Sequence, residues 1–151
     1  MIIYLGADHR GFKIKEYLKK FLLDKGYQVA DLGASQYAEG DDYPDFAAAV
    51  ARKVAADLGA GRGIVICGSG FGVDIVANKF EGIRSALASS ADQVYHARHD
   101  DDANVLSLAA NFLDETEAAK IVQVFLLTPF SPEPRYQRRL EKISEIERFR
   151  E

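Results

Sequence analysis

The sequence contains a single cysteine and no tryptophan among its 151 residues. One cysteine excludes an internal disulfide, so a hydrophobic core has to stabilise the fold without a covalent crosslink. No apolar run approaches the ~20 residues that a membrane-spanning helix needs, and no apolar signal segment follows Met1. These absences lead us to expect a cytoplasmic protein with no membrane partner.

An excess of positive charge is also missing. Lys and Arg number 19 against 23 Asp and Glu, which gives a formal net charge of −4 and an isoelectric point near 5.4. This balance removes the global electrostatic argument for nucleic acid as a partner. No repeat, low-complexity tract or Pro/Gly/Ser-rich linker divides the chain, and its length suits one core rather than two. We expect a single domain over residues 1–151.

What the sequence does contain is an alternation of short apolar runs and helical patterns. The apolar runs, each followed by glycine, polar residues or a helical pattern, are the predicted strands 2–7, 28–33, 63–68, 84–89 and 105–110. The predicted helices are 14–22 closed by Gly26, a second from Pro44 to Leu58, and then 73–80, 91–99, 115–127 and 134–149. Parallel strands need a crossover between them, nearly always right-handed. The alternation therefore predicts a doubly wound α/β fold with ligands at the carboxyl ends of its strands.

Two of the predicted helices are amphipathic. The helix over 14–22 has apolar residues at helical spacing, and its lysines fall largely on the opposite, polar side: Lys13, Lys15, Lys19 and Lys20. The helix over 134–149 carries an apolar stripe that we expect to be buried: Tyr136, Leu140, Ile143 and Ile146.

The only cysteine lies in the stretch ICGSGFGVD, where an apolar run gives way to the alternating Gly68, Gly70 and Gly72. At the start of a helix, the backbone N–H groups of these glycines are placed to receive an oxyanion or a phosphate. The alternative is a tight turn that permits close packing, and the spacing matches neither a dinucleotide fingerprint nor a P-loop. Cys67 is correspondingly either a small buried side chain or a thiolate that acts as a base or nucleophile.

Charged residues offer two further candidates. Arg135 and Arg139 stand four apart on one face of the last helix, at a like-charge cost of roughly 0.2–0.5 kcal/mol that a bound anion would offset; the alternative is a solvated face neutralised by nearby glutamates. The acidic run 100–102, with His96 and His99 before it, lacks the spacing of metal ligands and favours a hydrated loop with a helix-capping aspartate. We expect no metal and no cofactor.

Five motifs, in this order, resemble the type B ribose-5-phosphate isomerase family, which also includes the galactose-6-phosphate isomerase subunits. The resemblance runs nearly end to end, through RYQRR at 135–139. The motifs are GADHRGFK at 6–13, DYPD at 42–45, CGSGFG at 67–72, ANKFEGIR at 77–84 and DANVL at 102–106.

The resemblance implies a flavodoxin-like three-layer fold with a five-stranded parallel sheet and a C-terminal helix. It also implies a homodimer, with a tetramer left open, whose active sites lie at the subunit interface and isomerise an aldose to a ketose through an enediolate without a metal. Cys67 would be the base that moves a proton between C1 and C2, with Ser69 and the loop amides holding the oxyanion. The implied substrate-binding residues are Asp8, His9, Tyr43, Gly68, Gly70, Gly72, Asp101, Asn111, Arg135 and Arg139.

The sequence departs from the family pattern at four of these positions or their neighbours. Asp100 stands where the family has its ring-opening histidine, and Asp101 replaces an asparagine near the anion. Asn111 takes the place of a phosphate-binding arginine, and Tyr136 that of a histidine. Three outcomes are open for ring opening: His99 performs it from the neighbouring position, Asp100 is held protonated, or the substrate is a sugar phosphate with no ring, such as a tetrulose phosphate.

Two further readings remain open at this point. In the first, the chain works only with a paralogous partner chain, as galactose-6-phosphate isomerase subunits do. In the second, it is a non-catalytic sugar-phosphate-binding or regulatory paralogue. Retention of Cys67 and Ser69 argues for an enzyme, whereas Asp100 and Asp101 argue for the non-catalytic paralogue.

Overall fold

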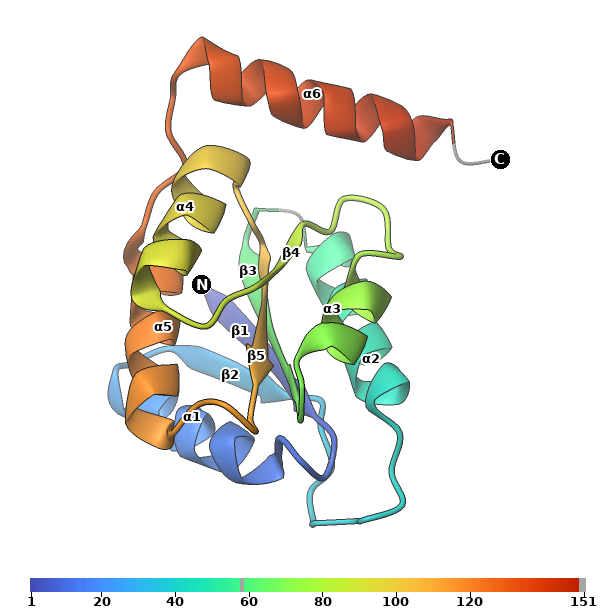
Figure 1. The fold of residues 1–151 in the computed structure, drawn as a ribbon, viewed down its shortest axis with the longest axis vertical. Helices are drawn as coiled ribbons and strands as arrows, with labels where there is room; N and C mark the ends of the chain where they lie inside the picture. Colours follow the sequence, from blue (N-terminus) through green and yellow to red (C-terminus); the bar gives the residue numbers. More distant parts are fainter. Residues whose placement is uncertain (58, 150–151) are drawn as a thin grey trace.

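The computed structural model describes residues 1–57 and 59–149, which form a three-layer α/β fold around one parallel sheet (Figure 1). The strands are β1 (Ile2–Ala7), β2 (Gln28–Asp31), β3 (Gly61–Cys67), β4 (Ser85–Leu87) and β5 (Val105–Ala109). The helices are α1 (Phe12–Asp24), α2 (Tyr43–Ala56), α3 (Phe71–Ala77), α4 (Ala91–Asp101), α5 (Glu115–Leu127) and α6 (Pro134–Arg148). The predicted five-stranded parallel sheet and C-terminal helix are confirmed.

The strands lie in the order β2-β1-β3-β5-β4, which exchanges the last two strands of the flavodoxin order 2-1-3-4-5. A right-handed crossover places its helix on one face when the chain moves one way across the sheet, and on the other face when it moves back. The chain moves the same way from β1 to β2 and from β4 to β5, so α1 and α4 share a face, together with α5. The opposite face carries α2 and α3 (Figure 1).

Burial agrees with the interior position of β5 and the edge position of β4. Every residue of β5 is buried, whereas β4 has three residues of intermediate exposure, as suits an edge strand. Residues of the inner strands alternate between two cores. Leu5 and Ile66 pack with α1, α4 and α5, while Val65 and Cys67 pack against α2 and α3. Cys67 therefore faces the side of the sheet on which α2 and α3 begin.

Lys15 does not lie on the polar side of α1 with the other lysines, and that prediction was wrong. Its side chain is fully buried and donates hydrogen bonds to Asp31 Oδ2 at 2.7 Å, Glu16 Oε1 at 2.6 Å and the carbonyl oxygen of Ala34 at 3.1 Å. A buried charge is tolerated when it is paired and hydrogen-bonded. The partner Asp31 lies 16 residues along the chain, so helical spacing could not reveal it.

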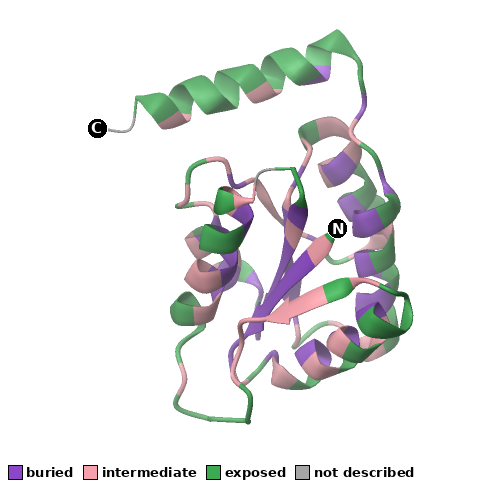
Figure 2. Cartoon of the chain, turned by 180° about the vertical axis from the view of Figure 1, so that it is seen from behind, coloured by how far each residue is buried: buried purple, intermediate pink, exposed green. Residues whose placement is uncertain are grey.

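The apolar stripe of α6 is not buried within the chain, so that expectation also needs correction. Tyr136 is 8% exposed, but Ile143 is 39% and Ile146 64% exposed. Figure 2 shows α6 as a largely exposed rod across one end of the molecule. Phe149, just beyond its end, is 83% exposed. The far half of α6 therefore presents an uncovered apolar surface.

The element boundaries lie within three residues of those predicted. The bounds of α5 and β1 match those predicted, while α3 begins at Phe71, two residues earlier than predicted, and Leu58 lies outside the described residues. The predicted loop at 100–102 is wrong in part, because Asp100 and Asp101 form the last turn of α4 and Asp102 is its left-handed C-cap, with φ 48°. In the described part of the chain, no helix is long and apolar enough to cross a membrane.

Candidate active site

The loop after β3 holds the Cys67 sulfur close to a backbone amide. Cys67 is 4% exposed, and its Sγ accepts the N–H of Gly70 at 3.2 Å. Gly70 is the N-cap of α3 with φ 78°, and a Cβ there would overlap Leu87 Cδ1. Only glycine meets both demands without strain. The predicted arrangement of one thiol and a glycine loop at the carboxyl end of a strand is therefore present, with Ser69 exposed beside it.

Tyr43 and Asn111 flank this loop from two other elements. A Cβ at Gly72 would lie 2.6 Å from the Tyr43 ring, so the ring rests on the backbone of Gly72. A Cβ at Gly68 would lie 3.1 Å from Asn111 Nδ2 and 2.7 Å from Arg10 Cδ. The backbone N–H of Asn111 also donates to the Gly68 carbonyl oxygen at 2.9 Å. Glycine at these positions lets polar side chains approach the loop backbone.

The loop after β1 contributes Asp8 and His9. Asp8 is 5% exposed, and its Oδ1 accepts the amides of Arg10 and Gly11, both at 3.0 Å, which shapes the turn into α1. Asp41 holds His9 twice, since its Oδ1 lies 2.8 Å from both the His9 amide nitrogen and Nδ1.

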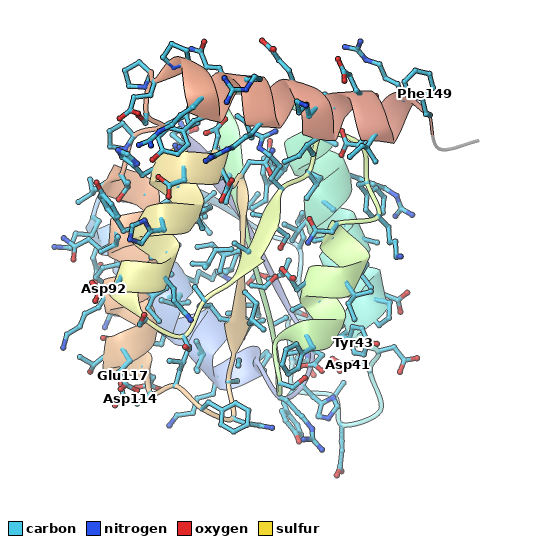
Figure 3. The ribbon with its side chains drawn as sticks, turned by 45° about the horizontal axis from the view of Figure 1, so that its top comes forward. Asp41, Tyr43, Asp92, Asp114, Glu117 and Phe149 are labelled. Carbon is cyan, nitrogen blue, oxygen red and sulfur yellow. The ribbon has the colours of Figure 1, made fainter. Side chains whose placement is uncertain are left out.

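Asp41 reaches His9 from the segment that leads into α2. Figure 3 shows Asp41 and Tyr43 close together at the start of α2. The second carboxylate oxygen of Asp41 is buried without a partner in the described structure. One oxygen therefore orients His9, and the other is left to accept a hydrogen bond.

The remaining predicted residues form a second group, where α4 ends and α6 begins. Asp100 accepts hydrogen bonds from His99 Nδ1 at 2.7 Å and from His96 Nδ1 at 3.2 Å. His99 stacks on Tyr95, with centroids 5.2 Å apart, and meets Tyr136 edge-on at 5.7 Å. His99 is thus held on three sides by ring contacts and one carboxylate.

These bonds decide the charge of Asp100. The hydrogen bond from His99 lowers the pKa of Asp100 below its ordinary value, against a raising effect of burial, and bonds from His96 and Tyr136 lower it further. A carboxyl group with a lowered pKa is ionised at neutral pH. The surroundings of Asp100 in this chain therefore favour its ionised form.

The guanidinium groups of Arg135 and Arg139 both contact the aromatic ring of Tyr136. Their Cζ atoms lie 4.7 and 5.7 Å from its centroid, and Arg135 also donates to the Tyr136 hydroxyl at 3.0 Å. Arg135 Nε lies 2.8 Å from a carboxylate oxygen of Glu133. This contact agrees with the alternative in which nearby glutamates neutralise the basic face of the helix. Asp101 is exposed and lines a cavity of about 270 Å³ with Ile143 and Ile146.

The two groups lie at opposite ends of the sheet. Helix α4 runs antiparallel to the strands, and its 11 residues span about 16 Å at 1.5 Å per residue. In Figure 1 the end of α4 lies beneath α6, while Cys67 ends β3 at the far edge. The structure brings Asp8, His9, Tyr43 and Asn111 to Cys67, but it leaves the arginines and His99 elsewhere. One chain therefore carries two halves of the predicted site that do not meet.

Sequence reasoning did not assign Arg10 or Asp41 to the site, and it considered His96 only as a metal ligand. Arg10 lay within a recognised motif, so its position after a strand was the available signal. Asp41 and His96 gave none, because their importance rests on contacts with His9 and Asp100. Among the residues described, no cluster of three or more His, Cys, Asp or Glu is arranged to hold a metal ion.

The fold and the loop together define a class of α/β enzyme that holds a small anionic substrate at the carboxyl ends of its strands. A family model described as Ribose/Galactose Isomerase matches residues 3–143. Ribose-5-phosphate isomerase B of Mycolicibacterium paratuberculosis is 41% identical over 148 residues, which cover 98% of this chain and 92% of that protein. The probable ribose-5-phosphate isomerase B of Mycoplasma genitalium is 41% identical over 146 residues, covering 97% and 95%.

Solved structures agree with this grouping. The crystal structure of ribose-5-phosphate isomerase B from Mycoplasma genitalium with bound ribulose-5-phosphate is 40% identical, with a TM-score of 0.94 over 98% of this chain and 97% of that one. The enzyme from Clostridium thermocellum gives a TM-score of 0.93 at 39% identity, covering 98% of each chain. The chain belongs to the ribose/galactose isomerase family. It is an aldose–ketose isomerase, and these comparisons give no support to the non-catalytic paralogue.

Proposed function

We propose that this chain interconverts ribose 5-phosphate and ribulose 5-phosphate. The observation that carries the proposal is the Cys67 sulfur at the carboxyl end of β3, 3.2 Å from the Gly70 amide. The relatives named ribose-5-phosphate isomerase B support the choice of a five-carbon substrate. A single cysteine suits a reducing compartment, and the proposal includes a cytoplasmic location.

The chemistry is a proton transfer between neighbouring carbons. The C2 proton of the open aldose moves to the Cys67 thiolate, the C–H electron pair becomes the C1–C2 double bond, and negative charge collects on O1. Backbone amides of residues 68–72 and the Ser69 hydroxyl stabilise that charge. Return of the proton to C1, with transfer of the O2 hydroxyl proton to O1, completes the ketose. Asp8, His9 and Tyr43 hold the sugar hydroxyls.

Proton exchange tests this role directly. Purified chain should exchange the C1 proton of ribulose 5-phosphate with deuterated water, and Cys67→Ser should slow exchange by ~10²-fold or more, the usual range for loss of a general base. Circular dichroism controls for folding. Exchange within a few-fold of the parent would remove Cys67 from the mechanism, and no exchange by the parent on any aldose or ketose phosphate would refute the function.

The proposal includes a homodimer in which each site is composite. The second group of residues lies about one helix length from Cys67 in the same chain, so a second copy has to supply Arg135, Arg139 and His99. Ile143, Ile146 and Phe149 are exposed on or just beyond α6, and burying such apolar surface stabilises association. In a two-fold dimer the same surfaces meet reciprocally.

Mixing two inactive variants tests the composite site. Cys67→Ser and the Arg135→Gln/Arg139→Gln double variant damage different halves, so a heterodimer of the two keeps one intact site. Random exchange of subunits should restore about a quarter of parent activity. Mixing Cys67→Ser with parent-like Arg138→Gln provides the comparison for subunit exchange. If native mass spectrometry with one variant isotope-labelled shows that heterodimers form while the first mixture remains inactive, each site belongs to one chain.

We propose that His99 opens the sugar ring, in place of the residue that Asp100 replaces. The support is geometric: Asp100 holds His99 Nδ1 at 2.7 Å, which leaves Nε2 for the substrate. Ribulose 5-phosphate has no ring, because its O5 carries the phosphate, whereas ribose 5-phosphate has to open before its C2 proton becomes acidic. His99→Gln should therefore reduce isomerisation of ribose 5-phosphate about 10²-fold and leave C1 exchange of ribulose 5-phosphate nearly unchanged.

A second candidate substrate is favoured by the ionised Asp100. A four-carbon tetrulose phosphate is already linear, so a site with a carboxylate at position 100 loses nothing in handling it. Its kcat/KM should then exceed that of ribose 5-phosphate in the parent and be insensitive to His99→Gln. A parent that prefers ribose 5-phosphate, together with a large effect of His99→Gln, would exclude the linear substrate.

A further inference from the structure

Three arginines lie near one another at the amino ends of the strands, which form the end of the sheet opposite Cys67. Arg62 lies in β3, Arg84 directly precedes β4, and Arg98 lies in α4. They line one cavity of about 220 Å³, together with Asp102 and Asn104. Neither the proposed reaction nor the residues assigned to it use this cavity.

One carboxylate serves two of the three guanidinium groups. Asp102 Oδ1 lies 2.7 Å from Arg98 Nη1, and Asp102 Oδ2 lies 2.8 Å from Arg84 Nη2. Both oxygens of Asp102 are therefore engaged. Asp57, at the same end of the sheet, accepts the Tyr4 hydroxyl at 3.0 Å. The lining of the cavity thus has two positive charges in excess.

Arg62 is the least satisfied of the three. A guanidinium has five N–H donors, and within the described residues Arg62 makes one side-chain hydrogen bond, from Nη1 to the Phe125 carbonyl oxygen at 2.6 Å. The Cζ atoms of Arg62 and Arg98 lie 5.5 and 5.9 Å from the centroid of the Phe125 ring. Burial and then the charge of Arg98 lower the pKa of Arg62 to about 10.

Arg62 is partly buried, and a partly buried cation with no carboxylate bonded to it among the described residues is incompletely stabilised, a cost that a bound anion offsets. Guanidinium groups match the geometry of tetrahedral oxyanions, which they bind through paired N–H donors. The cavity of about 220 Å³ is smaller than the ~300 Å³ at which pockets for drug-sized ligands begin. We propose that this cavity binds one tetrahedral oxyanion, a phosphate or the phosphoryl group of a small ester, with Arg62 as its principal ligand.

Inorganic phosphate is the probe, and the Arg135→Gln/Arg139→Gln double variant is the background, because those residues belong to the proposed substrate site. Calorimetry in that background, at constant ionic strength, should show one phosphate per chain. Adding Arg62→Gln should weaken binding at least ten-fold, while adding the exposed Arg138→Gln should change it less than two-fold. Ribose 5-phosphate in the same titration distinguishes the source: tighter binding than phosphate, lost with Arg62→Gln, identifies an ester.

Two results would overturn the site: no saturable phosphate binding in the background variant, or binding that Arg62→Gln leaves unchanged. If Arg62→Gln does not fold, crystals of the parent soaked in tungstate provide the decision. Anomalous density between Arg62 and Arg98 supports the site, and an empty cavity overturns it. The catalytic proposal is unaffected either way, because proton exchange with Cys67 is measured separately.

Discussion

Gly70→Ala should damage both the stability of the fold and the chemistry of Cys67. Residue 70 has φ 78°, where alanine costs about 1–2 kcal/mol, and the new Cβ would overlap Leu87 and lie 3.2 Å from the Ala109 amide nitrogen. Overpacking of that kind costs a further ~1–3 kcal/mol. Gly26 is a matched control, because it has φ 84° but nothing within 4 Å of an added Cβ. Gly26→Ala should therefore lose only the stability that the strained backbone conformation costs.

Urea denaturation and thermal unfolding at equal protein concentration measure the difference. In a protein of this size, 1 kcal/mol shifts Tm by about 2–4 °C, so Gly70→Ala should melt roughly 2–12 °C below Gly26→Ala. The Gly70 amide also donates to Cys67 Sγ at 3.2 Å. Its displacement should lower kcat/KM by about 10²-fold, the effect of losing one oxyanion donor, whereas Gly26→Ala keeps parent activity. Equal stability and activity of the two variants would refute the packing argument.

Three further changes test other parts of the structure. Asp41→Asn weakens the bond that orients His9, and the loss of a charge-assisted bond of about 1.5–3 kcal/mol should lower kcat/KM by about 10- to 150-fold, measured beside urea midpoints that report the accompanying loss of stability. Burial raises the pKa of Asp31, but hydrogen bonds from Lys15 and Lys19 outweigh burial, so the pKa is lowered overall. The stability that the Asp31 carboxylate contributes is therefore fully present above its unfolded pKa, near 3.9. This stability is lost as the pH falls below that value. Urea midpoints of the parent should drop as the pH falls through 4 more than those of Asp31→Asn. Ile146→Asp puts a charge on the exposed stripe of α6 and should convert the proposed dimer to monomers in light scattering; a dimeric mass that stays unchanged would place the interface elsewhere.

The sequence predicted local structure well because its signals are local. The bounds of α5 follow from a capping box, in which Asp114 and Glu117 bond one another's backbone amides. Cys67 and its glycines could likewise be placed at a strand end from an apolar run and three alternate glycines. The strand order could not be predicted from the sequence, because it depends on the direction in which the chain crosses the sheet after β4. The short, partly polar β4 is the one signal that marks an edge strand.

The halves of the candidate site could not be separated from sequence either. Motifs suggest that residues serve one reaction, but they do not show that α4 carries His99 to the opposite end of the sheet from Cys67. Lys15 illustrates the same limit on a smaller scale. Its helical spacing assigns it to the polar side, while contacts with Asp31 and Ala34 allow it to be fully buried.

The structure shows which groups surround the residues that depart from the family pattern. Asn111 lies beside Gly68 together with Arg10, so a positive charge remains near the loop although the arginine at 111 is missing. Asp100 is bonded to two imidazoles, and a carboxylate engaged in this way repels an anionic substrate less than a free one. Asp101 lines a cavity with Ile143 and Ile146, away from the His99 ring. At positions 100 and 111 the change in charge is therefore accompanied by nearby groups that offset it, the imidazoles of His96 and His99 at Asp100 and the side chain of Arg10 at Asn111.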